Sequence, residues 1–223
     1  MKKITIPIIV FLMSISSNAQ GFKKKIELKE GLTNNIKYKA LNIGALLQVY
    51  GEKSAAHLIG DMYLKLDNNG EFITEFYIDN DKATKEYYTK IYGNYFLTFV
   101  IENNIKYLII EQALFGKAFA LSSNGSSSIG NKDDLVEIEI TNYVHEWGSD
   151  GLPQDGKSNY FDDVHYTLKV KVKNDVKSFS FYSSEVKDDF VMDLGEYSIQ
   201  ILSDLFKDSS SLIEMVITKK EGK

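Results

Sequence analysis

Short runs of alternating apolar and polar residues, separated by turn-forming residues, are the feature that most constrains the fold of this chain. The runs "TLKVKVK" and "VKSFSFY", residues 167–173 and 176–182, alternate most regularly, and Asn174-Asp175 lies between them. A period of two places alternate side chains on opposite faces of a β-strand. Asn69-Gly70 and Asn103-Asn104 separate two similar pairs of runs, as expected for hairpin turns.

Runs of this kind continue to the end of the chain, where "EYSIQILSDLF" and "SSSLIEMVITKK" form a further pair. The sequence therefore predicts an all-β fold that is mostly antiparallel and β-sandwich-like, as one large domain or two packed β domains. At most one or two short helices are expected. The best helix candidate is "NDKATKEYYTKIYG", residues 80–93, because Gly93 can end a helix.

A Ser/Gly-rich segment, residues 122–134, interrupts this pattern near the middle of the chain. Such a composition offers few side chains for packing and predicts a linker or a loop. It would separate an N-terminal β domain or half, residues 20–121, from a C-terminal β-sandwich domain or half, residues 135–223.

The N-terminus predicts export. Lys2 and Lys3 precede a short apolar run, and small residues end at Ala19, which fits a signal peptide of residues 1–19 that is cleaved before Gln20. The apolar run is too short to span a bilayer, which takes ~20 residues. We therefore expect a soluble periplasmic or extracellular protein without membrane insertion after cleavage. The chain has no cysteine, so neither disulfides nor a lipid attached through cysteine are expected.

The charge of the chain argues against nucleic acid as a partner. The formal net charge is −5, and all 26 basic residues are lysines. Arginine supplies the rigid donor fork that recognises phosphate and guanine, and this chain has none. An acidic chain of this kind is also poorly suited to an anionic membrane surface.

The most function-like segment is "VHEWGSDGLPQDGKSNYFDDVHY", residues 144–166. If the strands on either side pair with Glu139 opposite Lys171, then His145 falls opposite His165 on the polar face. Opposed Cβ atoms lie ~4.5–5.5 Å apart, so both imidazoles could reach one ion. With Glu146 close by, this arrangement would suit zinc or copper.

Two other interpretations explain the same segment. Calcium could be bound by loop oxygens, although the spacing does not match a helix-flanked calcium loop; the candidate carboxylates are Asp150, Asp155, Asp162 and Asp163. Alternatively, the segment is a plain solvated loop that binds no cofactor, with Trp147 at the edge of the core. The sequence leaves these interpretations open.

No catalytic residue is assigned, because the chain has neither a G-x-S-x-G nor an H-E-x-x-H motif. Tyr87, Tyr88, Tyr92 and Tyr95, together with Trp147, could instead stack on a glycan or contact a protein, although such tyrosines also commonly cover a sheet edge. We therefore expect a ligand- or partner-binding module. The alternatives are a secreted metal-dependent hydrolase using His145 and His165, and an assembly protein that contacts partners through an edge strand.

Overall fold

The computed structural model describes residues 23–49, 62–78, 89–123, 126–149, 160–187, 190–207 and 210–220. These residues form β-strands and one short 3₁₀ turn, η4 (Ser183–Glu185), and no α-helix is present among them. The predicted all-β, sandwich-like fold is confirmed. Within these ranges, no helix is long and apolar enough to cross a membrane. The predicted signal peptide, residues 1–19, lies outside the described residues.

The strands form three sheets. The central sheet has the order β1 (Lys23–Glu27), β8 (Ile105–Gln112), β7 (Tyr95–Glu102), β6 (Thr89–Tyr92), β9 (Ala118–Ser122), β16 (Ser210–Lys219), β15 (Tyr197–Lys207) and β14 (Val191–Asp193). The N-terminal sheet comprises β2 (Thr33–Tyr38), β3 (Leu41–Val49), β4 (Met62–Asn68) and β5 (Glu71–Ile78). The C-terminal sheet comprises β10 (Ser126–Asn131), β11 (Asp134–Ser149), β12 (Tyr160–Val172) and β13 (Asp175–Tyr182).

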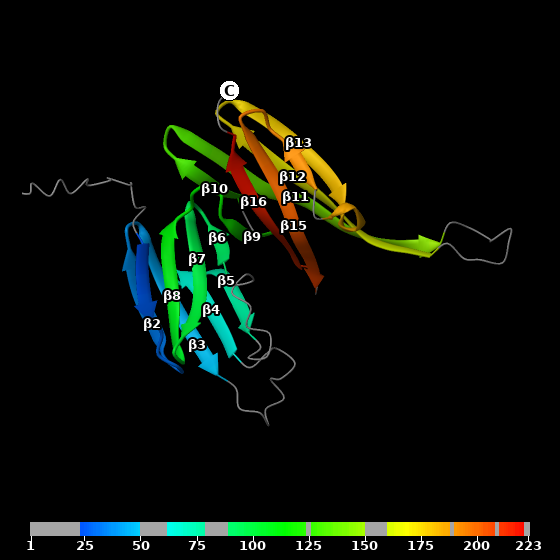
Figure 1. Cartoon of the computed structure of the whole chain (residues 1–223). Coiled ribbons are helices and arrows are strands. Elements are labelled where there is room, and N and C mark those ends of the chain that lie inside the picture. The colour runs from blue at the N-terminus through cyan, green and yellow to red at the C-terminus, as the bar shows by residue number, and fades with distance from the viewer. Residues whose placement is uncertain are drawn as a thin grey trace, which may run out of the picture.

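The central sheet takes part in two β-sandwiches, one on each of its faces (Figure 1). The alternation along β7 shows this directly: Leu97 and Phe99 belong to the core shared with the N-terminal sheet, whereas Phe96 belongs to the core shared with the C-terminal sheet. The two halves of the central sheet meet where β6 and β9 run parallel, with Lys90 opposite Ala120. Both cores are therefore built on one continuous sheet.

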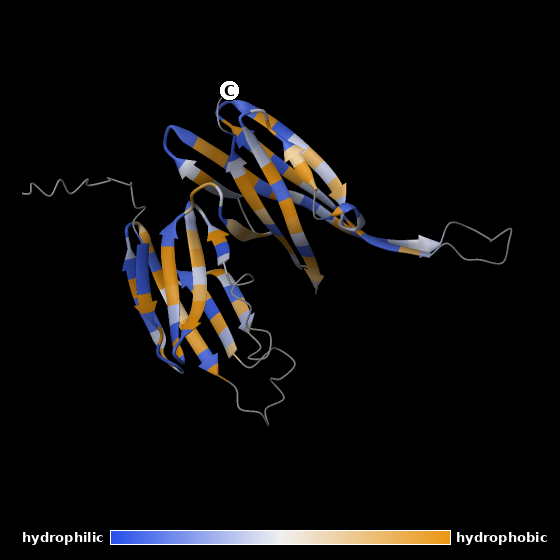
Figure 2. Cartoon of the chain, viewed as in Figure 1, coloured by the Kyte–Doolittle hydropathy of each residue, from blue (hydrophilic) through white to orange (hydrophobic). Residues whose placement is uncertain are grey.

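Alternation along the strands accounts for this packing. Figure 2 shows hydrophobic and hydrophilic residues following one another along the strands of both sandwiches. The apolar members are almost completely shielded from solvent, for example Leu64 in the N-terminal core and Ile199 in the C-terminal core, both 0% exposed. Burial of such side chains contributes roughly 1.5–3 kcal/mol each.

The predicted hairpins form as expected. Asn69 and Gly70 have positive φ between β4 and β5, and Asn103 and Asn104 have positive φ between β7 and β8. The turn between β12 and β13 lies one residue earlier than predicted, because the positive φ falls on Lys173 and β13 already begins at Asp175.

The predicted linker or loop at residues 122–134 is corrected by the structure. β10 lies inside it and pairs with β11, with Ser127 and Ile129 buried. Three consecutive serines at residues 126–128 conceal the strand pattern, since only Ile129 places a large apolar side chain on the buried face. β9, which belongs to the predicted N-terminal half, pairs with β16 and places Phe119 in the C-terminal core. The two sandwiches therefore do not divide the chain at this segment.

The predicted helix at residues 80–93 is corrected over its last part. Residues 89–92 are strand β6, because Thr89 and Ile91 alternate as buried residues in the middle of the central sheet. Residues 80–88 lie outside the described residues.

Candidate functional site

A two-stranded arm projects from the C-terminal sandwich (Figure 1). β10 pairs with β11 only as far as Glu139, and β13 pairs with β12 only as far as His165. Beyond these points β11 and β12 continue as a pair, and we call His145–Ser149 with Tyr160–Val164 the arm. Within the described residues, no third strand pairs with either edge of the arm.

The arm does not have the predicted register. Glu137, rather than Glu139, lies opposite Lys171, and the Lys171 Nζ to Glu137 Oε1 distance is 2.8 Å. An irregularity between Ile140 and Asn142 then adds an unpaired residue to β11, so that His145 lies opposite Val164. The predicted pairing of His145 with His165 is wrong for these two reasons.

The inner face of the arm continues the face that covers the C-terminal core. Here the His145 Nε2 to Asp162 Oδ1 distance is 2.6 Å, and the His145 ring lies 5.2 Å from the ring of Phe206. Further out, this face carries Trp147 and Tyr160, whose exposed fractions are 68% and 63%. Two large aromatic side chains therefore lie beyond the reach of the core.

The outer face carries Glu146, Asp163 and His165. Each contacts the end of β13 or the η4 turn: the Tyr182 hydroxyl donates to Glu146 over 3.4 Å, and the rings of His165 and Tyr182 lie 4.7 Å apart. The negative charge of Glu146 raises the pKa of Tyr182.

Asp163 joins the arm to the η4 turn. Its carboxylate accepts hydrogen bonds from the Ser184 hydroxyl, the Ser184 N–H and the Val164 N–H. Partial burial acts to raise the pKa of Asp163, but the hydrogen bonds from Ser184, Val164 and Ser183 outweigh it and lower the pKa. The ionised carboxylate is therefore the form that holds the base of the arm in place.

Phe161 also lies on the outer face, opposite Gly148. A Cβ atom on Gly148 would meet the Phe161 ring at 3.3 Å, so glycine leaves room for the ring across the strand. Phe161 and Val144 remain 43% and 42% exposed. Apolar side chains thus lie on both faces of the arm and its base.

The predicted metal ligands are divided between the two faces. His145 and Asp162 lie on the inner face, and Glu146, Asp163 and His165 lie on the outer one. Among the described residues, no group of three histidine or acidic side chains is placed to hold a metal ion. The hydrolase hypothesis thus loses the histidine pair on which it depended. Asp150 and Asp155 lie outside the described residues, so calcium binding by the loop stays a prediction.

Only half of the predicted tyrosine patch lies within the described residues. Tyr92 and Tyr95 are half-buried and pack against the N-terminal core, where the rings of Tyr95 and Tyr38 lie 5.7 Å apart. Tyr87 and Tyr88 lie outside the described residues.

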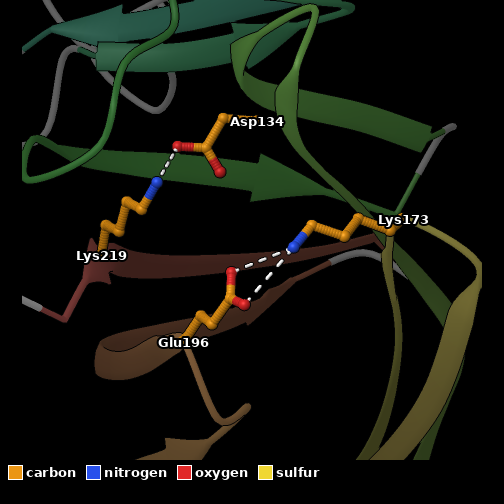
Figure 3. Close-up of polar contacts among 4 residues, drawn as sticks. All are labelled: Asp134, Lys173, Glu196 and Lys219. Atoms are coloured by element: carbon orange, nitrogen blue, oxygen red, sulfur yellow. Dashed lines mark hydrogen bonds and ion pairs between the residues drawn. The ribbon is translucent and has the colours of Figure 1, made fainter. Parts of the chain in front are cut away.

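An open cleft of about 480 Å³ lies at the other end of the C-terminal sandwich, beside the β12–β13 turn. Figure 3 shows Lys173 pointing toward Glu196, with Lys219 and Asp134 forming a separate pair. The Lys173 Nζ lies 3.3 and 3.2 Å from the two carboxylate oxygens of Glu196. Because these opposite charges satisfy one another, the cleft is a weaker ligand-site candidate than the arm.

No model of a known protein family matches the chain, and no curated protein sequence matches it either. The function therefore has to be inferred from the structure of the arm. Sequence reasoning selected Trp147 but missed Tyr160 and Phe161. The adjacency of these two aromatic residues is the signal that could have found them, because neighbours in a strand face opposite ways and both cannot be buried in one core.

Proposed function

We propose that this protein is a binding module whose arm contacts a protein partner. The observation that carries the proposal is the exposure of Trp147, Tyr160 and Phe161 on a ribbon of two strands. Aromatic residues are enriched at protein interfaces, where they bury a large area at small cost in conformational entropy.

The ribbon also has little support of its own. An isolated pair of β-strands is marginally stable in water, whereas a third strand or a packed apolar face stabilises it. The Asp163 contacts with Ser184 hold only the base of the arm. A partner that adds a strand, or covers the aromatic side chains, would supply the missing packing.

A protein suits the arm better than a glycan. Sugars commonly stack on one aromatic platform, but here Trp147 and Tyr160 lie on the face opposite to Phe161. Occupying both faces requires a surface that surrounds the arm or several contacts along it. The carboxylates of Glu146, Asp162 and Asp163 further favour a partner that presents basic side chains.

Site-specific photocrosslinking tests this proposal. Trp147→p-benzoylphenylalanine places the crosslinker on the arm, and Phe72→p-benzoylphenylalanine places it on β5, where the exposed fraction is a comparable 51%. In cells that naturally produce the protein, we expect protein adducts from position 147 and not from position 72. Adding Phe161→Ser to the Trp147 variant should remove most of the adduct, because the partner loses its contact on the other face.

The absence of adducts at position 147, or equal adducts at both positions, would contradict the proposal. An adduct that survives Phe161→Ser would indicate chance proximity of the crosslinker rather than binding by the arm.

A further inference from the structure

β1 is a second edge strand in the described part of the chain, and it is strongly basic. Three of its five residues are lysines, Lys23, Lys24 and Lys25. It is the terminal strand of the central sheet and, within the described residues, pairs only with β8. In Figure 1 β1, in blue, lies at the side of the molecule away from the arm.

The charges of the arm and β1 are complementary. Among His145–Ser149 and Tyr160–Val164 there are three acids and no lysine. Lysines along an edge strand disfavour pairing with another neutral or basic strand. An acidic strand removes this penalty, so the lysines of β1 select for an edge such as that of the arm.

We propose that the arm of one copy of this chain adds as a strand to β1 of a second copy. This inference rests on the proposed function, because it names the protein partner of the arm. The contact uses the edge of β11, which lacks a neighbouring strand beyond Glu139 in the described part of the chain.

Alternate residues of β1 direct their backbone N–H and C=O groups away from β8, as such a contact needs. The Leu28 N–H donates to the Lys106 carbonyl on β8, at 2.8 Å. Because backbone groups alternate in direction along a strand, the even positions of β1 point toward β8. Lys23, Lys25 and Glu27 therefore direct their N–H and C=O groups to the free edge.

Alternate residues of β11 in the arm likewise direct their backbone N–H and C=O groups away from β12. The Val164 N–H donates to the side chain of Asp163 instead of to β11. The pair His145 and Val164 is thus a non-hydrogen-bonded pair within the arm. It follows that His145 and Trp147 direct their backbone groups to the free edge of β11.

One antiparallel register that joins these outward-directed backbone groups sets Lys25 opposite His145. The same register sets Lys24 opposite Glu146, Ile26 opposite Val144 and Lys23 opposite Trp147. It combines a charge pair, an apolar pair and a lysine beside an indole ring, each favourable across strands. A shift of two residues in either direction loses the pair of Lys24 with Glu146.

The position of the two edges determines the kind of assembly. β1 and the arm lie at opposite sides of one molecule (Figure 1), so each copy can donate one arm and accept another. A contact between two different surfaces that does not close into a ring produces an open, linear assembly.

Sedimentation velocity on the full chain, expressed for export and purified, tests the inference over a range of concentrations. We expect the sedimentation coefficient to rise with concentration without reaching a dimer plateau. Lys24→Glu or Glu146→Lys alone sets like charges opposite one another and should weaken association about tenfold or more. The double variant should restore it, because the charge pair is reformed in reverse. Lys65→Glu, an exposed lysine on β4, is the matched control and should associate like the wild type.

Association that is unchanged in both single variants, or that is not restored in the double variant, would overturn the pairing of the arm with β1. A chain that stays monomeric at every concentration would also overturn it. The photocrosslinking experiment then decides the proposed function separately: an adduct to another protein at position 147 supports the arm as a binding surface, whereas no adduct refutes that as well.

Discussion

At the scale of single residues, the Asp163 carboxylate has a structural role, because it joins the arm to the η4 turn. Neighbouring acids in a sequence suggest a shared ligand, but Asp162 and Asp163 face opposite sides of the arm. Asp162 meets His145, and Asp163 accepts hydrogen bonds from the η4 turn. The lowered pKa of Asp163 follows from these donors, so the carboxylate stays charged at more acid pH than an ordinary aspartate.

Asp163→Asn should therefore destabilise the protein by about 1 kcal/mol near neutral pH, because hydrogen bonds to a charged acceptor are replaced by weaker ones. A carboxyl group with a lowered folded-state pKa stabilises fully above its unfolded-state pKa, and the stabilisation is lost as the pH falls through the folded-state pKa. The difference between wild type and variant should accordingly shrink toward acid pH. Urea unfolding at a series of pH values measures it.

Asp133→Asn, in the exposed β10–β11 turn, is the matched control for this loss of charge, and we expect a change of no more than about 0.5 kcal/mol. Parallel pH profiles for wild type and Asp163→Asn would show that the η4 contacts do not depend on the charge of Asp163.

At the scale of elements, one irregularity decides which side chains share a face of the arm. The apolar face of β11 occupies even positions up to Ile140. After the bulge, Tyr143 and His145 continue the inner face at odd positions. A β-bulge adds one residue to one strand and also bends it, which is common where a strand leaves its sheet.

Pairs of introduced cysteines test this register in a chain that has none of its own. His145→Cys with Val164→Cys should form a disulfide readily, since a non-hydrogen-bonded pair brings the Cα atoms to ~4.5 Å. His145→Cys with His165→Cys should not, because these side chains lie on opposite faces. Mass spectrometry of oxidised, proteolysed protein distinguishes the two. Disulfide formation by the second pair alone would contradict the observed register and support the one predicted from the sequence.

At the scale of the whole molecule, the central sheet joins two cores that lie on its opposite faces. β7 contributes to both, with Phe96 in the C-terminal core and Phe99 in the N-terminal core, each 1% exposed. The two sandwiches therefore share backbone hydrogen bonds along one sheet, although their cores are separate clusters.

Phe96→Ala and Phe99→Ala should each cost about 3–5 kcal/mol, as expected for a large buried aromatic residue. The effects should differ in location. Hydrogen exchange should accelerate mainly in β9 and β16 for Phe96→Ala, and mainly in β3 and β4 for Phe99→Ala. Equal acceleration in both sandwiches for either variant would show that the shared sheet makes the molecule one cooperative unit.

The sequence by itself determined most of the strands and turns and the all-β class, because side-chain alternation and the positive φ of residues such as Asn69 and Asn103 are local properties. It also indicated the segment around Trp147. It did not determine that β6 and β10 are strands or that His145 and His165 lie apart. Those outcomes depend on which strands pair and where the bulge falls, and these are set by packing between residues distant in the chain. Only the tertiary structure could decide them, because one added residue in β11 moves every later side chain to the other face.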